Sequence, residues 1–169
     1  DFCDYIVLSP GINLKKSKLK NKLLRNKHKI ITDLDLFYLF NPNIRSIVIT
    51  GTNGKSTTCK ILEHVLKKNR INVKLGGNIG KPVLELSPLK EGSIRILELS
   101  SYQIELAKCL APNFAAFINF SSDHLQRHGG LGGYFYAKAR LFLENLTDVS
   151  VINIDTAEAV SYTHLRAHE

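Results

Sequence analysis

The sequence predicts an α/β protein with a mostly parallel sheet and helices on both faces. Two observations lead to this prediction. Short apolar runs alternate with helix-like segments along most of the chain, and the runs themselves are almost continuously apolar. Strands buried on both faces have this composition, and strands that alternate with helices pair in parallel through right-handed crossovers.

The first 43 residues predict two strands and two helices. Apolar runs predict strands at 5–8 and 30–31, and a Ser-Pro-Gly turn follows the first of them. Between these strands lies a lysine-rich helical segment with Leu19, Leu23 and Leu24 on one face. The second helix is predicted at 33–40, and the Asn-Pro-Asn sequence at 41–43 is our candidate linker.

Beyond the linker the alternation becomes regular. Strands are predicted at 44–50, 72–75, 94–99, 114–120 and 149–154, and helices at 56–69, 102–110 and 133–145. Residues 157–169 continue no periodicity, and we expect them to be a non-native tail. The chain contains no methionine, so we also expect it to be a fragment of a longer protein.

The composition is that of a globular protein, with 44% hydrophobic residues and a net charge of +8. Much of the positive charge lies between residues 15 and 29 without interleaved aromatic residues, which favours a solvated helix face over a nucleic-acid site. No apolar run approaches the roughly 20 residues of a membrane-spanning helix. The three cysteines match no zinc or disulfide spacing, so we expect small buried residues. We therefore predict a cytoplasmic protein without a nucleic-acid or membrane partner, and we expect it to be a monomer.

The strand at 44–50 leads into the motif Gly51-Thr52-Asn53-Gly54-Lys55-Ser56-Thr57, and a helix follows. In a phosphate-binding loop, backbone N–H groups and a helix N-terminus point at the anion, a lysine reaches the outer phosphates, and a hydroxyl binds Mg²⁺. This loop is shorter than the usual one, with only two residues between its glycines. Such residues also open helices by chance, but their register between strand and helix favours phosphate binding.

Polar residues follow the neighbouring strands as well. The glycine-rich segment at 76–80 follows one strand, and Glu98 ends another. A third strand is followed by Asn119, Asp123 and His124. The carboxyl ends of parallel strands meet at one edge of the sheet, where ligands bind. A carboxylate that interrupts a buried strand is costly unless it is paired, and Mg²⁺ would pair it.

Each of these residues also has a structural interpretation. Glu98 could cap a neighbouring helix, and Asp123 could be the N-cap of the helix that follows it. His124 alone would more often be a hydrogen-bonded structural histidine. Lys138, on the last predicted helix, would by itself be an ordinary surface lysine.

Taken in order, these motifs resemble those of the Mur ligases. The matching segments are 51–57, 77–80, 97–103, 119–124 and 136–138. The resemblance extends over residues 4–155 and implies an ATP-binding central domain of the P-loop type at 44–156. Residues 1–43 would be the back half of a Rossmann-like, UDP-binding domain. The turn at 9–12 and the run at 123–128 resemble the members that add D-glutamate to UDP-N-acetylmuramoyl-L-alanine.

The resemblance implies an amide-forming ligase of peptidoglycan precursor synthesis. ATP would activate the substrate carboxylate as an acyl phosphate, and the amine of D-glutamate would displace phosphate. This chemistry requires positioning and cations rather than a protein nucleophile. The domain that binds D-glutamate would lie outside this chain, so we expect the chain alone to be inactive.

The resemblance also implies roles for single residues. Residues Gly51, Thr52, Asn53, Gly54, Lys55, Ser56 and Thr57 would bind ATP, and Lys55 would hold its β- and γ-phosphates. Ser56 or Thr57 with Glu98 would bind one Mg²⁺, and His124 a second. Lys138 matches a lysine that is carbamylated in the family and would become a metal partner. Gly11, Asn78 and His124 would face the UDP-linked substrate. The expected catalytic residues are Lys55, His124 and Lys138. Gln126 departs from the family pattern, which commonly has an acid there.

Other functions remain open from the sequence. The chain could belong to another Mur-type ligase or to one that resembles folylpolyglutamate synthase. In a different class, it could be a non-catalytic module that binds nucleotides or nucleic acid. Salt-dependent DNA binding without binding of an ATP analogue would favour that last interpretation.

Overall fold

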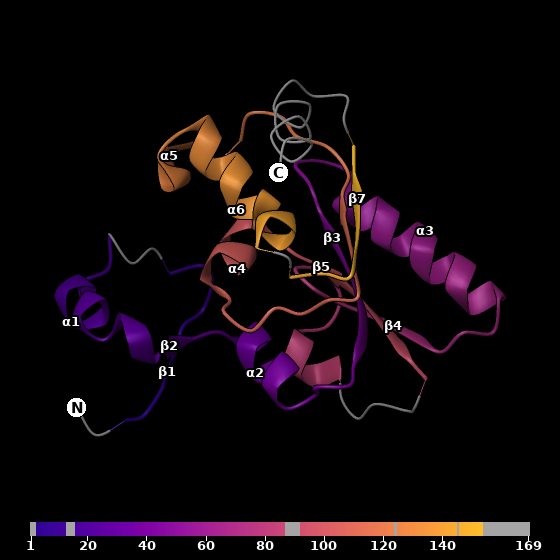
Figure 1. The fold of residues 1–169 in the computed structure, drawn as a ribbon, viewed down its shortest axis with the longest axis horizontal. Helices are drawn as coiled ribbons and strands as arrows, with labels where there is room; N and C mark the ends of the chain where they lie inside the picture. The colour runs from indigo at the N-terminus through magenta and orange to yellow at the C-terminus, as the bar shows by residue number, and fades with distance from the viewer. Residues whose placement is uncertain (1–2, 13–15, 87–91, 124, 145, 154–169) are drawn as a thin grey trace.

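The computed structural model describes residues 3–12, 16–86, 92–123, 125–144 and 146–153. Its main feature is a parallel five-stranded sheet in the order β4-β5-β3-β6-β7 (Figure 1). The strands are β3 (Arg45–Thr50), β4 (Val73–Gly77), β5 (Ile94–Glu98), β6 (Phe114–Phe117) and β7 (Val149–Ile152). The predicted α/β class and parallel pairing are confirmed.

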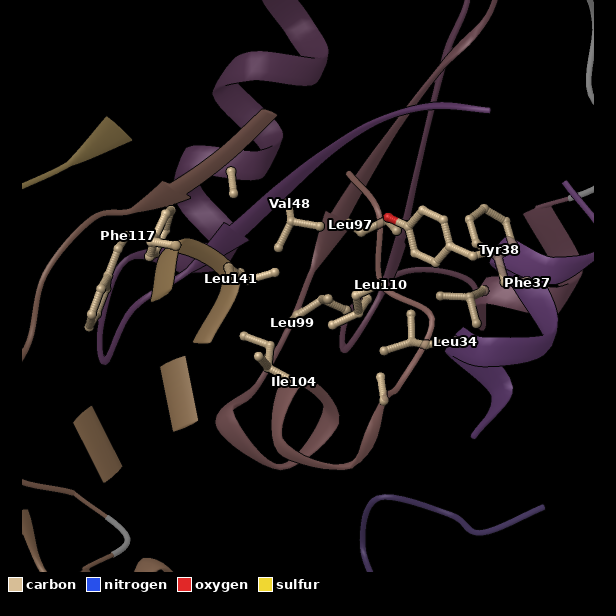
Figure 2. Close-up of a cluster of buried hydrophobic side chains, with 14 of the residues drawn as sticks. Leu34, Phe37, Tyr38, Val48, Leu97, Leu99, Ile104, Leu110, Phe117 and Leu141 are labelled. Carbon is tan, nitrogen blue, oxygen red and sulfur yellow. The ribbon is translucent and has the colours of Figure 1, made fainter. Parts of the chain in front are cut away.

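Helices cover both faces of this sheet, because both faces are apolar. On one face, α3 (Lys55–Lys68) packs on a core that includes Ile49, Cys59 and Ile96. On the other face lie α2 (Asp33–Leu39), α4 (Ser101–Leu106) and α6 (Leu131–Leu143). Figure 2 shows the larger core on that side, where side chains of β3 and β5 meet those of the three helices. Neighbouring residues of one strand thus enter different cores, which explains the continuous apolar runs.

The beginning of the chain forms a second, small parallel sheet. Here β1 (Ile6–Val7) pairs with β2 (Ile30–Ile31), and α1 (Lys20–Arg25) lies between them in the sequence. Leu8, Leu23 and Ile30 form a small core of their own. The next helix, α2, instead places Leu34, Phe37 and Tyr38 in the large core (Figure 2). The predicted domain limits at 43 and 156 stay a prediction.

Several elements end or begin elsewhere than the sequence predicted, mostly by one or two residues, and in two of them distant contacts surround the new end. The strand predicted to reach residue 120 ends at Phe117, since the following residues bond to the phosphate loop. The helix predicted to reach 110 ends at Leu106, where the next amides donate to Asp35 and Arg140 donates to the last carbonyls. The last helix begins two residues early, at Leu131. Short helices at Val83–Leu86 and Leu125–His128 (α5) were not predicted.

Several composition-based expectations can be compared with the structure. The arginine and the described lysines of the basic stretch are exposed, apart from the half-buried Lys29, as expected for a solvated face. Cys59 is buried and Cys109 half-buried, but Cys3 is exposed, so the prediction of buried cysteines is wrong for Cys3. Within the described residues, no helix combines the length and the hydrophobicity needed to cross a bilayer. The predicted tail at 157–169 lies outside the described residues.

Candidate functional site at the carboxyl edge of the sheet

The predicted phosphate loop connects β3 to α3 at the carboxyl edge of the sheet. Gly51 has φ +154° and Gly54 has φ +72°, and Gly54 is the N-cap of α3. A Cβ atom at Gly51 would lie 2.7 Å from Cγ1 of Ile118, so a side chain cannot be accommodated there without a shift. The two glycines therefore let the chain turn sharply and place Lys55, Ser56 and Thr57 in the first turn of a 14-residue helix.

Two lysines from distant parts of the chain meet at this loop. Nζ of Lys55 donates to the carbonyls of Gly51 (3.0 Å) and Thr52 (2.7 Å). Nζ of Lys138, on α6, donates to the same Gly51 carbonyl at 2.7 Å. Two ammonium groups thus share one carbonyl oxygen, which makes this edge of the sheet attractive to anions.

Lys138 is not the surface lysine of the structural interpretation, since only 2% of it is exposed. Its Nζ also lies 4.8 Å from the centre of the Tyr134 ring. The pKa of Lys138 is lowered from 10.5 to about 7, mainly by burial and secondly by the Lys55 ammonium, while Asp123 acts in the opposite direction. A substantial fraction of this amine is therefore neutral and nucleophilic near neutral pH.

Glu98, at the end of β5, is buried beside the first turn of α3. Its Oε2 accepts a hydrogen bond from the Ser56 hydroxyl (2.7 Å), and its Oε1 accepts one from the Asn78 side-chain amide (3.0 Å). The Asn78 backbone N–H also donates to the Glu98 carbonyl at 2.8 Å. The structure thus brings together Ser56, Asn78 and Glu98, which the sequence predicted to lie at one edge. Thr57, by contrast, is exposed.

The sequence placed Asn119 after a strand but indicated no role for it at the site. Its side-chain Oδ1 accepts from the backbone N–H groups of Thr52 (3.0 Å) and Asn53 (2.9 Å), and its Nδ2 donates to the Asn53 carbonyl (2.9 Å). Asn119 therefore holds the loop from the end of the neighbouring strand. The only signal for this role in the sequence was the position of an amide side chain just after a predicted strand.

Of the remaining predicted residues, Asp123, Gln126 and Gly11 are described and His124 is not. Asp123 is exposed, and His124 lies outside the described residues. Gln126, on α5, is also exposed. Gly11 is exposed in the turn after β1, and its carbonyl accepts a hydrogen bond from Arg127 of α5 (3.2 Å). The turn at 9–12 therefore contacts the segment that directly follows Asp123.

The donor set fits a magnesium–nucleotide complex. Mg²⁺ takes oxygen ligands, commonly only one or two carboxylates with phosphates and water, and here a buried carboxylate lies beside a hydroxyl at a helix N-terminus. Among the residues described, no three His, Cys, Asp or Glu side chains gather at one point. A protein-only metal cage is therefore not present in that part of the chain.

Comparisons with known proteins agree with this geometry. The family described as Mur ligase middle domain matches residues 49–168. A UDP-N-acetylmuramoylalanine–D-glutamate ligase of Ruegeria pomeroyi is 52% identical over 116 residues, which are 69% of this chain and 25% of that protein. The ligase of the same name from Jannaschia is 50% identical over 114 residues, 68% and 25% of the two chains. The chain thus spans about a quarter of the length of these relatives.

Solved structures share the fold at lower identity. A UDP-N-acetylmuramoyl-L-alanyl-D-glutamate–2,6-diaminopimelate ligase superposes with a TM-score of 0.65 at 23% identity, over 98% of this chain and 46% of that one. A Neisseria UDP-N-acetylmuramate:L-alanyl-gamma-D-glutamyl-meso-diaminopimelate ligase gives 0.58 at 18% identity, over 96% and 55%. From the family match and the parallel sheet that carries this loop, we conclude that the chain belongs to the Mur ligase family, through its middle domain.

Proposed function

We propose that the full-length protein carrying this chain is an ATP-dependent ligase that joins D-glutamate to UDP-N-acetylmuramoyl-L-alanine in peptidoglycan precursor synthesis. The observation that carries this proposal is the convergence of Lys55 and Lys138 on the Gly51 carbonyl, beside the buried pair of Ser56 and Glu98. The names of relatives that are about half identical to this chain supply the two substrates. We place the reaction in the cytoplasm and propose a monomer.

The proposed reaction requires two anions, a carboxylate and the γ-phosphate, to approach each other. The γ-phosphoryl group passes to the carboxylate oxygen and leaves ADP; the amine of D-glutamate then attacks the acyl carbon, loses a proton and releases phosphate. Bound Mg²⁺-ATP supplies the phosphoryl group and neutralises charge on the phosphates. Lys55 would release its carbonyl partners and bind the β- and γ-phosphates. The metal would be held by Glu98 and a hydroxyl, which is that of Ser56 or, as the alternative, that of Thr57.

We propose that Lys138 is carbamylated in the working enzyme. The Lys138 ammonium would first lose a proton, and the neutral amine would then add to carbon dioxide and release a second proton. A carbamate anion would thereby replace the buried cation beside Lys55. That exchange would remove the repulsion between the two ammonium groups and supply a second metal partner. Peptide mass analysis of the full-length enzyme should find a carbon-dioxide adduct on Lys138, and full activity of Lys138→Ala at low bicarbonate would exclude this role.

The remaining assignments complete the proposed site. His124 would bind the second Mg²⁺ and, with Gly11 and Asn78, face the UDP-linked substrate. Residues 1–43 would belong to the UDP-binding domain and 44–156 to the central ATP-binding domain. The tail at 157–169 would take no part in the chemistry.

A ligation assay on the full-length protein tests the proposed function. With ATP, Mg²⁺, UDP-N-acetylmuramoyl-L-alanine and D-glutamate, mass spectrometry should detect the amide product together with equal amounts of ADP and phosphate. Replacing D-glutamate with L-alanine or meso-diaminopimelate should give little product. Lys55→Ala should lose both product and nucleotide binding, whereas Lys60→Ala, an exposed lysine on the same helix, should keep both. Product formation with another amino acid in place of D-glutamate would refute the substrate assignment.

A further inference from the structure

Arg127 connects the beginning of the chain to the central sheet. The guanidinium group of this α5 residue donates hydrogen bonds to the carbonyls of Pro10 (2.6 Å), Gly11 (3.2 Å) and Ile12 (3.2 Å). Its Cζ also lies 4.0 Å from the centre of the Tyr102 ring on α4. One side chain thus joins three segments that are far apart in the sequence.

The helix that carries Arg127 depends on such contacts. At four residues, α5 is too short to be stable by itself, so its position must come from its neighbours. On one side His128 is hydrogen-bonded to the Ser101 hydroxyl (2.9 Å) and stacks on the Tyr102 ring at 5.2 Å. On the other side Arg127 supplies the contact to the turn at 9–12. Removing Arg127 would leave α5 attached to α4 but would release the turn.

We propose that Arg127 is a positioning residue that holds the 9–12 turn in one conformation against α5 and thereby prepares it for the UDP-linked substrate. The proposal rests on the proposed function, in which Gly11 faces that substrate. A guanidinium group suits this task because it is planar, always charged and donates in several fixed directions, so one side chain can hold three carbonyls. A turn that is already ordered before the ligand arrives loses less entropy on binding.

Steady-state kinetics of the full-length protein test the proposal. In Arg127→Gln, KM for UDP-N-acetylmuramoyl-L-alanine should rise about tenfold or more, because the turn would lose hydrogen bonds from a charged donor that are each worth about that factor. KM for ATP should stay within about twofold of the unmodified protein, because the described contacts of Arg127 are with the 9–12 turn and Tyr102 rather than with the phosphate loop. Arg127→Lys keeps the charge and the aliphatic stem and should restore part of the loss. Arg25→Gln, an exposed arginine on α1, should change neither KM. An equal rise of both KM values in Arg127→Gln would overturn the proposal.

Hydrogen exchange provides a second measurement that does not depend on ligation. In Arg127→Gln the amide of Ile12, which donates to the Ser9 carbonyl (3.0 Å), should exchange faster, while peptides from α3 should exchange as before. Unchanged exchange at 9–12 would overturn the role of Arg127 even in an active enzyme. If the unmodified protein does not ligate these substrates but exchange at 9–12 rises as expected, the proposed function fails and the contact between turn and α5 stands.

Discussion

Replacing Glu98 with glutamine separates the charge of this side chain from its hydrogen bonds. Glutamine has the same size, and its carbonyl oxygen can still accept from the Asn78 amide. Its NH₂ group can donate to the Ser56 hydroxyl, which accepts as well as donates. Both contacts of Glu98 can therefore persist in Glu98→Gln, at 2.7 and 3.0 Å in the present structure.

The expected change in stability follows from two opposing effects. A hydrogen bond to a charged group is worth about 1.5–3 kcal/mol and a neutral one about 0.5–1.5 kcal/mol, so weakening two of them costs about 2–3 kcal/mol. Removing the charge also removes the cost of keeping a carboxylate buried, which is several kcal/mol for a side chain that is 2% exposed. We therefore expect the free energy of unfolding to change by less than about 2 kcal/mol.

The expected change in Mg²⁺ binding is much larger. Even two unit charges about 4 Å apart, at an effective dielectric constant of about 20, interact with about 4 kcal/mol. Loss of the Glu98 charge should therefore lower Mg²⁺-dependent affinity for the nucleotide by at least about 100-fold. Binding measured without Mg²⁺ should change little, because Lys55 and the N-terminus of α3 remain.

Calorimetric titration of a non-hydrolysable ATP analogue into the full-length protein measures the nucleotide affinity with excess Mg²⁺ and, in EDTA, without it. The unmodified protein should bind more tightly with Mg²⁺, and Glu98→Gln should bind equally in the two conditions. Glu63→Gln makes the same substitution on α3 at a residue that pairs with Lys67, and should keep the Mg²⁺ effect. A folded Glu98→Gln protein with the full Mg²⁺ effect would refute the assignment of Glu98 as a metal ligand.

Two further predictions concern the loop and its buried lysine. Asn119→Ala should weaken binding of the ATP analogue about tenfold, because the N–H groups of Thr52 and Asn53 lose their acceptor. Asn113, just before β6, accepts a similar hydrogen bond from the Ser46 N–H, and Asn113→Ala should leave the affinity for the ATP analogue unchanged. Equal losses of affinity in both variants would contradict the role of Asn119. The pKa of Lys138 is about 7 in the folded protein and 10.5 for an ordinary lysine, as in the unfolded state. Between pH 7 and 10.5 the unfolded state therefore binds a proton that the native state lacks, so the free energy of unfolding rises with pH. In chemical denaturation at low bicarbonate, the unmodified protein should gain about 1.4 kcal/mol per pH unit relative to Lys138→Met above pH 7, and at most about 5 kcal/mol in total. The exposed control Lys60→Met should show no such difference, and parallel pH profiles for Lys138→Met and the unmodified protein would contradict the low pKa.

The sequence by itself determined the features that depend on neighbouring residues. Continuous apolar runs between helical segments predicted the parallel sheet, because burial on both faces requires apolar residues at successive positions. The motif at 51–57 predicted the turn from β3 into α3, since its glycines and the residues that open the helix are adjacent in the chain. The chemistry at the strand ends was predicted for the same reason: the carboxyl ends of parallel strands share one edge.

Only the tertiary structure decided how distant residues act on that edge. Lys138 reads as a surface lysine within its own helix, and its burial and low pKa arise from packing against a loop 87 residues earlier. Asn119 holds the phosphate loop across a separation of 67 residues, and Arg127 reaches the Gly11 carbonyl across 116. Such contacts depend on strand order and on how helices pack over the sheet. No local pattern encodes them, because their partners become neighbours only after the chain has folded.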